Sequence, residues 1–242
     1  MRLWGITARG LVRKENQDSF RLCALDEEHG FGLVCDGMGG ARAGNVASDQ
    51  AAEMFRQELQ SRLTGIGVDD LHDLLTEVTK QANRAVYEHS LSDAECRGMG
   101  TTAVAAVVLG ETVAVLNVGD SRCYFVDDQT IDQITRDHSL VNDLVLRGEL
   151  TPEEARHHPS KNLITRALGV EEMVKPDIYM LQRKAGGYLL LCSDGLSNTV
   201  TDPEIQYEVI HGGEPEDCCQ RLLDIALTRG APDNVTAVLV QL

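Results

Sequence analysis

The sequence has no apolar run long enough to cross a lipid bilayer. Its longest apolar stretch, Ala103 to Val118, is interrupted by Gly110 and Glu111, whereas a spanning helix needs about 20 consecutive apolar residues. The first nine residues also lack the apolar core of a secretion signal. We therefore expect a cytoplasmic protein with no segment inserted in a membrane.

Positive charge is scarce. The 242 residues include 22 Lys and Arg against 38 Asp and Glu, a net charge of −16. Such a chain repels nucleic acids and anionic membranes, and no Lys/Arg run is dense enough to offset this. We expect no nucleic-acid partner, and a phosphorylated substrate would have to be attracted locally, by metal ions or by a placed arginine.

Several familiar catalytic signatures are missing. None of the seven cysteines is followed six residues later by arginine, which excludes the Cys-x5-Arg loop of cysteine phosphatases. The segment from Gly39 to Ser48 lacks the Gly-Lys-Ser/Thr ending of a P-loop. The histidines show no metal-binding spacing, and an odd number of scattered cysteines indicates reduced thiols rather than a disulfide framework.

Hydrophobic periodicity and turn signals divide the chain into helices and strands. Thr151 and Thr201 each begin a Thr-x-x-Glu capping box with proline at the next or second position, so a helix is expected after each. The predicted amphipathic helices cover 47–63, 71–86, 202–210 and 215–228. The predicted strands cover 19–25, 101–109, 112–118, 123–127 and 235–242. The three consecutive strands from 101 to 127 are expected to form a β-meander.

Because strands follow one another and helices come in pairs, the pattern favours antiparallel sheets packed face to face over a doubly wound parallel sheet. We predict an α+β fold with helical pairs outside the sheets. No linker or repeat interrupts the sequence, so a single domain over 1–242 is expected.

Four acidic residues stand where an apolar, strand-like run meets a turn: Asp36, Asp120, Asp194 and Asp233. Singly, each has an ordinary explanation, since Asp-Gly and Pro-Asp-Asn are also common turn sequences. Together they are more informative, because buried carboxylates repel one another unless cations gather them. Oxygen donors without a His or Cys cluster suit Mg²⁺ or Mn²⁺ rather than zinc, so two such ions are predicted.

Arg13 is the candidate for binding an anion near the amino terminus. It lies five residues before Asp18, which precedes a predicted strand. A guanidinium can donate two parallel hydrogen bonds to a phosphate. An ordinary solvated arginine beside Lys14 and Glu15 is the alternative when this segment is considered alone.

Six short motifs follow one another along the chain: Arg13-x-x-Asn-Gln-Asp18, Asp36-Gly-Met-Gly-Gly40, Gly98-Met-Gly-Thr-Thr102, Val118-Gly-Asp-Ser-Arg122, Ser193-Asp-Gly-Leu196 and Asp233-Asn-Val-Thr236. In this order they resemble the motifs of the PP2C-type (PPM) family of metal-dependent Ser/Thr protein phosphatases, and in particular its small bacterial single-domain members. The resemblance runs from about Gly10 to Leu239. Apart from the Gly98–Thr102 motif, to which we assign only sheet support, each carries a candidate site residue.

The resemblance implies a four-layer αββα sandwich and a dinuclear Mn²⁺ or Mg²⁺ site. Asp36 would bridge the two ions and the carbonyl of Gly37 would bind one of them. Asp194 and Asp233 would complete the site, with Asp18 binding directly or through water. Asp120, with Asp194, would hold a third, weaker ion, and Arg13 would bind the substrate phosphate.

The segment from about 135 to 168 matches the flap beside the active site in this family. Relatives carry a histidine at the position of Met38 or of Ala41, and this chain has neither. The proton donor to the leaving group is therefore open: a metal-bound water or a flap histidine, with His158 favoured over His157 and His138.

The reaction implied is direct hydrolysis of phosphoserine or phosphothreonine by a metal-bridging hydroxide. Expected partners are phosphoproteins and a cognate Ser/Thr kinase, and a monomer is expected. Two alternatives stay open from the residues alone: a phosphatase of small phosphoesters, and a catalytically silent module that binds a phosphoprotein.

Overall fold

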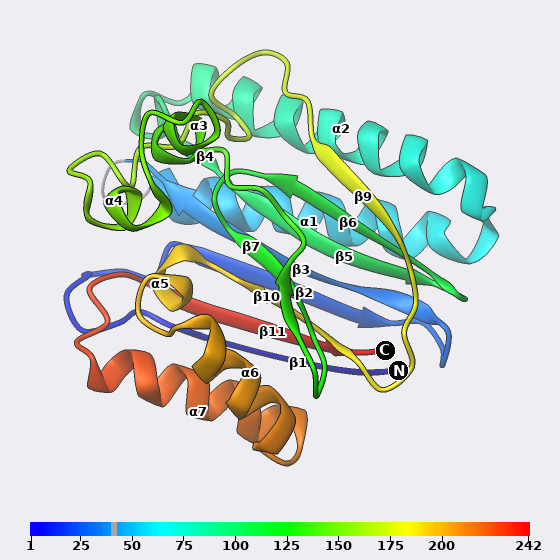
Figure 1. Cartoon of the computed structure of the whole chain (residues 1–242). Helices are drawn as coiled ribbons and strands as arrows, with labels where there is room; N and C mark the ends of the chain where they lie inside the picture. Colours follow the sequence, from blue (N-terminus) through cyan, green and yellow to red (C-terminus); the bar gives the residue numbers. More distant parts are fainter. Residues whose placement is uncertain (40–42) are drawn as a thin grey trace.

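Two antiparallel sheets face each other and helices cover their outer faces, giving four layers (Figure 1). This computed structural model describes residues 1–39 and 43–242. The predicted α+β sandwich is therefore confirmed. Gly40 and Ala41, which the sequence analysis singled out, lie outside the described residues.

Each sheet combines strands from distant parts of the chain, and all the named strand pairs are antiparallel. The first sheet has the order β1 (Arg2–Ala8), β11 (Val235–Gln241), β10 (Tyr188–Cys192), β7 (Arg122–Val126) and β8 (Ile131–Gln133). The second has the order β2 (Asp18–Ala24), β3 (His29–Met38), β5 (Ala103–Leu109), β6 (Thr112–Val118) and β9 (Asp177–Gln182), with the short β4 (Gly100–Thr101) also paired to β3.

The predicted β-meander over 101–127 is wrong at its third strand. β5 and β6 form the expected hairpin, but β7 belongs to the first sheet and pairs with β10 and β8. The chain changes sheets at Gly119, whose φ is +113° and where a Cβ would lie 2.5 Å from Thr102 Cγ2. Glycine is thus needed at this crossing, and the uniformly apolar flanking sequence does not reveal it.

The helices form one group on each outer face and a third group at one end of the sandwich (Figure 1). Both predicted capping boxes are present, at Thr151 and Thr201. The second sheet is covered by α1 (Ala43–Arg62) and α2 (Leu71–Ser92), the first by α5 (Asp194–Ser197), α6 (Asp202–His211) and α7 (Pro215–Thr228), and the end by α3 (Leu140–Leu146) and α4 (Pro152–His157); three 3-10 turns, η1 (Leu63–Gly65), η2 (Val68–Asp70) and η3 (Ala94–Cys96), flank α2.

The alternation of side chains along β3 shows how the layers share the core. Leu33 and Cys35 pack toward α1 and α2, while Val34 packs between the two sheets. Because successive residues of a strand face opposite sides, a strand buried on both sides must be apolar throughout. All seven cysteines are free, as expected. Within the described residues, no helix has the length and apolar character required to span a membrane.

Truncating a leucine beneath the second sheet should destabilise the fold strongly. Leu59 on α1 is fully buried, whereas Leu91 on α2 is 67% exposed. We expect Leu59→Ala to lower the free energy of unfolding by about 2–5 kcal/mol through lost burial and a residual cavity. Leu91→Ala should change it by less than about 0.5 kcal/mol. Urea unfolding followed by circular dichroism measures both, and equal effects would contradict this assignment of the core.

Candidate active site

Two of the acidic residues lie opposite each other on neighbouring strands of the second sheet. Asp18 begins β2 and is paired in register with Asp36 near the end of β3. Residues directly opposite in an antiparallel pair project from the same face of the sheet, with Cβ atoms about 4.5–5.5 Å apart. The pairing of β2 with β3 therefore sets the spacing of these two carboxylates.

The first sheet supplies two more acids from the adjacent strands β10 and β11. Asp194 follows β10 as the first residue of α5, and Asp233 lies two residues before the start of β11. The two sheets are joined here by hydroxyl groups, since Ser193 Oγ and Thr236 Oγ1 donate to Asp18 Oδ2 at 2.8 and 2.6 Å. The acids of both sheets thus meet at one end of the sandwich.

Asp120 enters the group from the crossing between the sheets, directly after Gly119. Burial raises its pKa to about 7, and the charge of Asp194 contributes further. Every acid predicted from the sequence is therefore brought to the same end of the molecule by β2, β3, β6, β10 or β11.

Burial is the main cause of raised pKa values throughout this acidic group, and repulsion between its members adds to it. The pKa of Asp18 is raised to about 6 by burial, with Asp194 and Asp233 adding to the increase against the lowering effect of its two hydroxyl partners. That of Asp194 is raised to about 6 by burial and then by Asp233. The pKa of Asp36 lies well above its ordinary value, through burial first and then the charges of the other acids. Without a cation, ionising this group is costly.

The residues fit hard divalent cations. Asp18 Oδ1 is buried and has no hydrogen-bond partner, and the donors offered are all oxygens, which Mg²⁺ and Mn²⁺ prefer. Gly37 lies against backbone atoms, because a Cβ there would approach the oxygens of Gly44 and Gln17 to 2.1 and 2.6 Å. The backbone of Gly37 is therefore held close beside Asp36.

The carboxylates are not closed around a single point. Among described residues, the one set of three His, Cys, Asp or Glu side chains with ligand atoms all within 4.8 Å of one another lies elsewhere, at His89, Asp93 and Cys96. The wider spread of the aspartates suits a centre shared between ions better than a cage around one ion.

Arg13 lies at the rim of the acidic group. Its Nη2 donates to Asp233 Oδ2 at 2.7 Å, and its side chain is half exposed. The guanidinium thus neutralises one of the acids and also reaches solvent, where an anionic substrate would arrive.

Asn234 fixes the loop that carries Arg13, a role that the sequence analysis missed. Its buried amide donates to the carbonyls of Arg9 and Glu15 and accepts from the amide of Gln17. The sequence analysis did single out the Asp233-Asn234 motif. However, an asparagine in a simple turn and one whose side chain binds a neighbouring loop cannot be told apart from sequence.

Thr101 and Thr102 fix the backbone of Asp36. Thr102 Oγ1 accepts from the Asp36 amide at 2.9 Å, and Thr101 Oγ1 donates to the Asp36 carbonyl at 2.9 Å. Ser121 extends this contact through its hydroxyl to Thr102. The sequence analysis assigned the Gly98–Thr102 motif only to sheet support. In the structure, the two threonines of this motif hold the backbone of Asp36.

The flap predicted over 135–168 contains α3 and α4 and lies at the end of the sandwich where α5 begins (Figure 1). His138 is buried, with Nδ1 accepting from the Gly119 amide and Nε2 bonded to Asp177, so its role is structural. His157 is exposed and contacts Glu153. His158 is half-buried, and its Nδ1 accepts from the Ser160 amide.

Two features near the acids had no motif to reveal them. The positive charge of Lys161, an exposed flap residue, lies near enough to Asp194 to lower its pKa against the effect of burial. A hollow of about 270 Å³ opens beside Met38. Its lining is mostly apolar and also includes the basic Arg166 and Lys175 and the acidic Glu171.

Comparison with known proteins gives one consistent family. Residues 12–228 match the family described as "Protein phosphatase 2C". The chain is 35% identical over 239 residues to the serine/threonine phosphatase stp of Listeria monocytogenes, covering 97% of this chain and 93% of that protein. It is also similar to the crystal structure of the serine/threonine phosphatase Stp1 from Staphylococcus aureus, with a TM-score of 0.90 and 38% identity over 99% of this chain and 94% of that one.

A third similarity concerns a structure that contains metal. The catalytic domain of the serine threonine protein phosphatase PstP in complex with two manganese ions has a TM-score of 0.85 and 35% identity, over 98% of this chain and 96% of that one.

Asp36→Asn should stabilise the metal-free protein. Asp36 ionises with difficulty in the fold, so its charge opposes folding at pH values above the unfolded pKa of 3.8 and has no such effect below it. The neutral amide removes this penalty. We expect a higher free energy of unfolding at pH 7 in chelator, with the gain shrinking as the pH falls toward about 4. Denaturant titrations across this pH range test it, with the exposed Asp128→Asn as control. A gain that persists at pH 4 would contradict the electrostatic explanation.

Proposed function

Since this chain belongs to the protein phosphatase 2C family and is a serine/threonine phosphatase, we propose that its buried aspartates hold two Mn²⁺ or Mg²⁺ ions for the hydrolysis of phosphoserine and phosphothreonine in proteins. One observation carries the proposal. Carboxylates from both sheets are buried together, and burial and mutual repulsion raise the pKa of Asp18, Asp36 and Asp194. A fold that retains this costly arrangement is explained by cations that the group binds.

Family resemblance implies the assignment of ligands, and the positions of the acids agree with it. Asp36, flanked by acids of both sheets, would be shared by the two ions, with the Gly37 carbonyl beside it. Asp194 and Asp233 would complete the pair from the first sheet. Asp18, with one oxygen unpartnered, would bind directly or through water. Asp120 and Asp194 together would hold a third, weaker ion. When bound, such ions lower the pKa of a shared water molecule and balance charge on phosphoryl oxygens.

Arg13 would bind the substrate phosphate through its planar guanidinium. In the structure this group is paired with Asp233. A cation bound at Asp233 would replace the guanidinium as that carboxylate's partner and leave it free for the phosphate. The hydrogen bonds of Asn234 to the loop that carries Arg13 do not involve the guanidinium. They would therefore hold this loop whether Arg13 is paired with Asp233 or bound to phosphate.

His158 is our candidate for the proton donor to the leaving alkoxide. Its Nδ1 accepts from the Ser160 amide in the neutral ring, which leaves the proton on Nε2. To act as a general acid the ring would first take up a second proton at Nδ1 and then return to the neutral form by donating the Nε2 proton to the alkoxide. The histidines of relatives at the positions of Met38 and Ala41 have no counterpart here, so a flap histidine or a water molecule must supply this proton.

A polypeptide substrate is favoured over a small phosphoester by the hollow beside Met38. Its mostly apolar lining, which also carries charged groups of both signs, offers contacts for residues that flank a phosphorylated side chain, and a small phosphoester would not use them. Phosphoproteins, and by family resemblance a cognate Ser/Thr kinase that phosphorylates them, are the proposed partners. The retained acids argue against a silent phosphoprotein-binding module. We propose one catalytic domain over 1–242 with a flap over 135–168, supported by the family match over 12–228.

Removing a bridging or first-sheet acid should abolish turnover. We expect Asp36→Asn and Asp194→Asn to lower kcat/KM on a phosphothreonine peptide by at least about 100-fold, since each change removes charge stabilisation in the transition state. Chelator should silence the wild type, and added Mn²⁺ or Mg²⁺ should restore it. Asp128→Asn serves as the control. Undiminished hydrolysis by either variant would refute the metal assignment, and parallel assays with sugar phosphates distinguish the small-phosphoester alternative.

Arg13→Ala should weaken binding of the phosphate without weakening binding of metal. Losing charge-assisted hydrogen bonds of about 1.5–3 kcal/mol predicts a fall of about 10- to 100-fold in kcat/KM, carried mainly by KM. Mn²⁺ affinity, measured by calorimetry, should not decrease, because Arg13 competes with the ion for Asp233. Lys14→Ala, which removes an adjacent exposed charge, is the matched control. A large loss of Mn²⁺ affinity in Arg13→Ala would exclude this role.

A further inference from the structure

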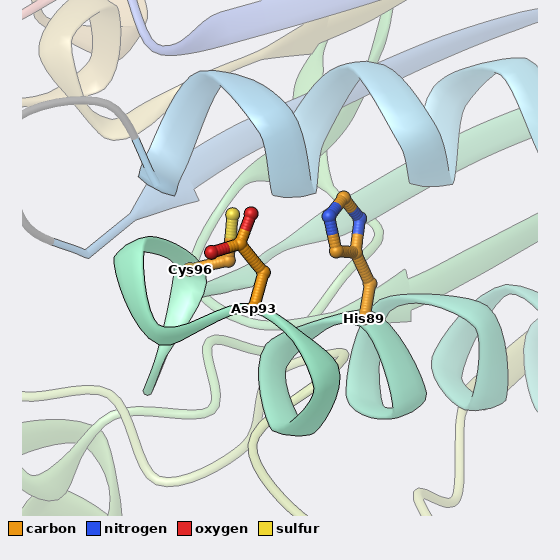
Figure 2. Close-up of side chains that lie close together, drawn as sticks. All are labelled: His89, Asp93 and Cys96. Carbon is orange, nitrogen blue, oxygen red and sulfur yellow. The ribbon is translucent and has the colours of Figure 1, made fainter.

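A second group of potential metal ligands lies at the C-terminal end of α2, on elements other than those that carry the aspartates. His89 on the last turns of α2, Asp93 at its C-cap and Cys96 in η3 bring one nitrogen, one oxygen and one sulfur within 4.8 Å of one another. Figure 2 shows the imidazole edge of His89 turned toward the Asp93 carboxylate and the Cys96 thiol. The proposed function gives these residues no role.

The hydrogen bonds around Gln50 fix the tautomer of His89. The Gln50 amide nitrogen donates to the carbonyl of Ala85, which can only accept. The amide oxygen of Gln50 therefore faces His89 Nδ1 at 2.9 Å, so Nδ1 must carry the ring proton. This leaves a free lone pair on Nε2. A histidine oriented by a hydrogen bond from its other nitrogen is the usual arrangement of a metal ligand.

Asp93 and Cys96 each also have an atom available to bind a metal ion. Asp93 Oδ1 accepts from the Glu95 amide, which holds the carboxylate in place and leaves Oδ2 available. Cys96 is buried, with 6% exposed. Burial, and the charges of Asp93 and Glu95, raise the pKa of its thiol. A hydrogen bond from the Cys96 thiol to the Asp93 carboxylate would explain why these two side chains lie together. It would not explain why the unprotonated nitrogen of His89, Nε2, belongs to the same group.

We propose that His89 Nε2, Asp93 and Cys96 Sγ bind a Zn²⁺ ion with one coordination position open to solvent. The mixed nitrogen, oxygen and sulfur set suits zinc, whereas the all-oxygen aspartate group suits Mg²⁺ or Mn²⁺. On binding, the thiol releases its proton to water, so affinity rises with pH. A surface hollow lies beside the imidazole, and His89 and Gln50 line it together with Asp49 and Asn45.

Such an ion would stabilise the segment that leads to Asp36. Cys96 is followed by Met99, which is fully buried, and by Thr101 and Thr102, which hold the Asp36 backbone. Fixing η3 to the end of α2 therefore secures the start of this segment. The effect on the free energy of unfolding follows the ion concentration relative to its dissociation constant, and it does not depend on turnover.

Co²⁺ is the probe, because a Co²⁺–thiolate bond gives a near-ultraviolet charge-transfer band that oxygen ligands do not. Full-length protein is stripped with chelator, saturated with Mg²⁺ to fill the aspartate group, and titrated with Co²⁺ and then with competing Zn²⁺. We expect a 1:1 band that Zn²⁺ abolishes. Cys96→Ser should lose the band, whereas Cys23→Ser, which changes a half-buried cysteine elsewhere, and Asp36→Asn should keep it.

Variants that leave the fold intact make the test independent of misfolding. The exposed Asp93→Asn and the partly buried Gln50→Leu should weaken Zn²⁺ by about 10- to 100-fold, and Gln50→Glu, which still accepts from Nδ1, should restore most of the affinity. Zn²⁺ should raise the Tm of the wild type but not of Cys96→Ser. Absence of the band in wild type, its persistence in Cys96→Ser, or unchanged affinity in both Asp93→Asn and Gln50→Leu would overturn the proposal, whatever the phosphatase assays show.

Discussion

Repulsion among carboxylates buried where the two sheets meet is the constraint on which the rest of this structure depends. Asp18 and Asp36 come from the second sheet, and Asp194 and Asp233 from the first. Gathering them raises their pKa values or demands a compensating charge. In the structure the compensation is partial: hydroxyls of Ser193 and Thr236 bind Asp18, and the guanidinium of Arg13 binds Asp233. Under the proposed function, the stability lost in this way would be the cost of a site that binds cations.

The surrounding scaffold holds these acids in place against their repulsion. Backbone groups of Asp36 are bound by Thr101 and Thr102, while the side chain of Asn234, the residue after Asp233, binds the backbone of the amino-terminal loop. Each restraint is a neutral hydrogen bond that adds no charge to the site. One apolar cluster packs between the two sheets and includes Val34, Val104 and Val238, so core packing sets the separation of the sheets that carry the acids. Since each sheet contributes acids, neither sheet could form the site alone.

Much of this could be predicted from local sequence. Capping boxes at Thr151 and Thr201 and the apolar faces of α1, α2 and α7 follow from short-range rules, and these elements were found. The acids were found because their motifs occur in family order. The change of sheet at Gly119 was missed, because strands buried on both faces look alike whichever sheet they join. The roles of Thr101, Asn234 and Lys161 were missed because each depends on a partner more than 60 residues away or on a charge that no local pattern marks.

The ion pair between Arg13 and Asp233 has a thermodynamic consequence for how ligands would load. While the guanidinium is paired with Asp233, it would be withheld from anions, so under the proposed function the chain would bind phosphorylated proteins more weakly without cations. A cation that displaced it would raise the affinity for phosphate, and linkage then requires that phosphate raise the affinity for the cation by the same factor. A phosphatase arranged in this way would bind few of its phosphorylated targets when metal ions are lacking, which is when it could not dephosphorylate them.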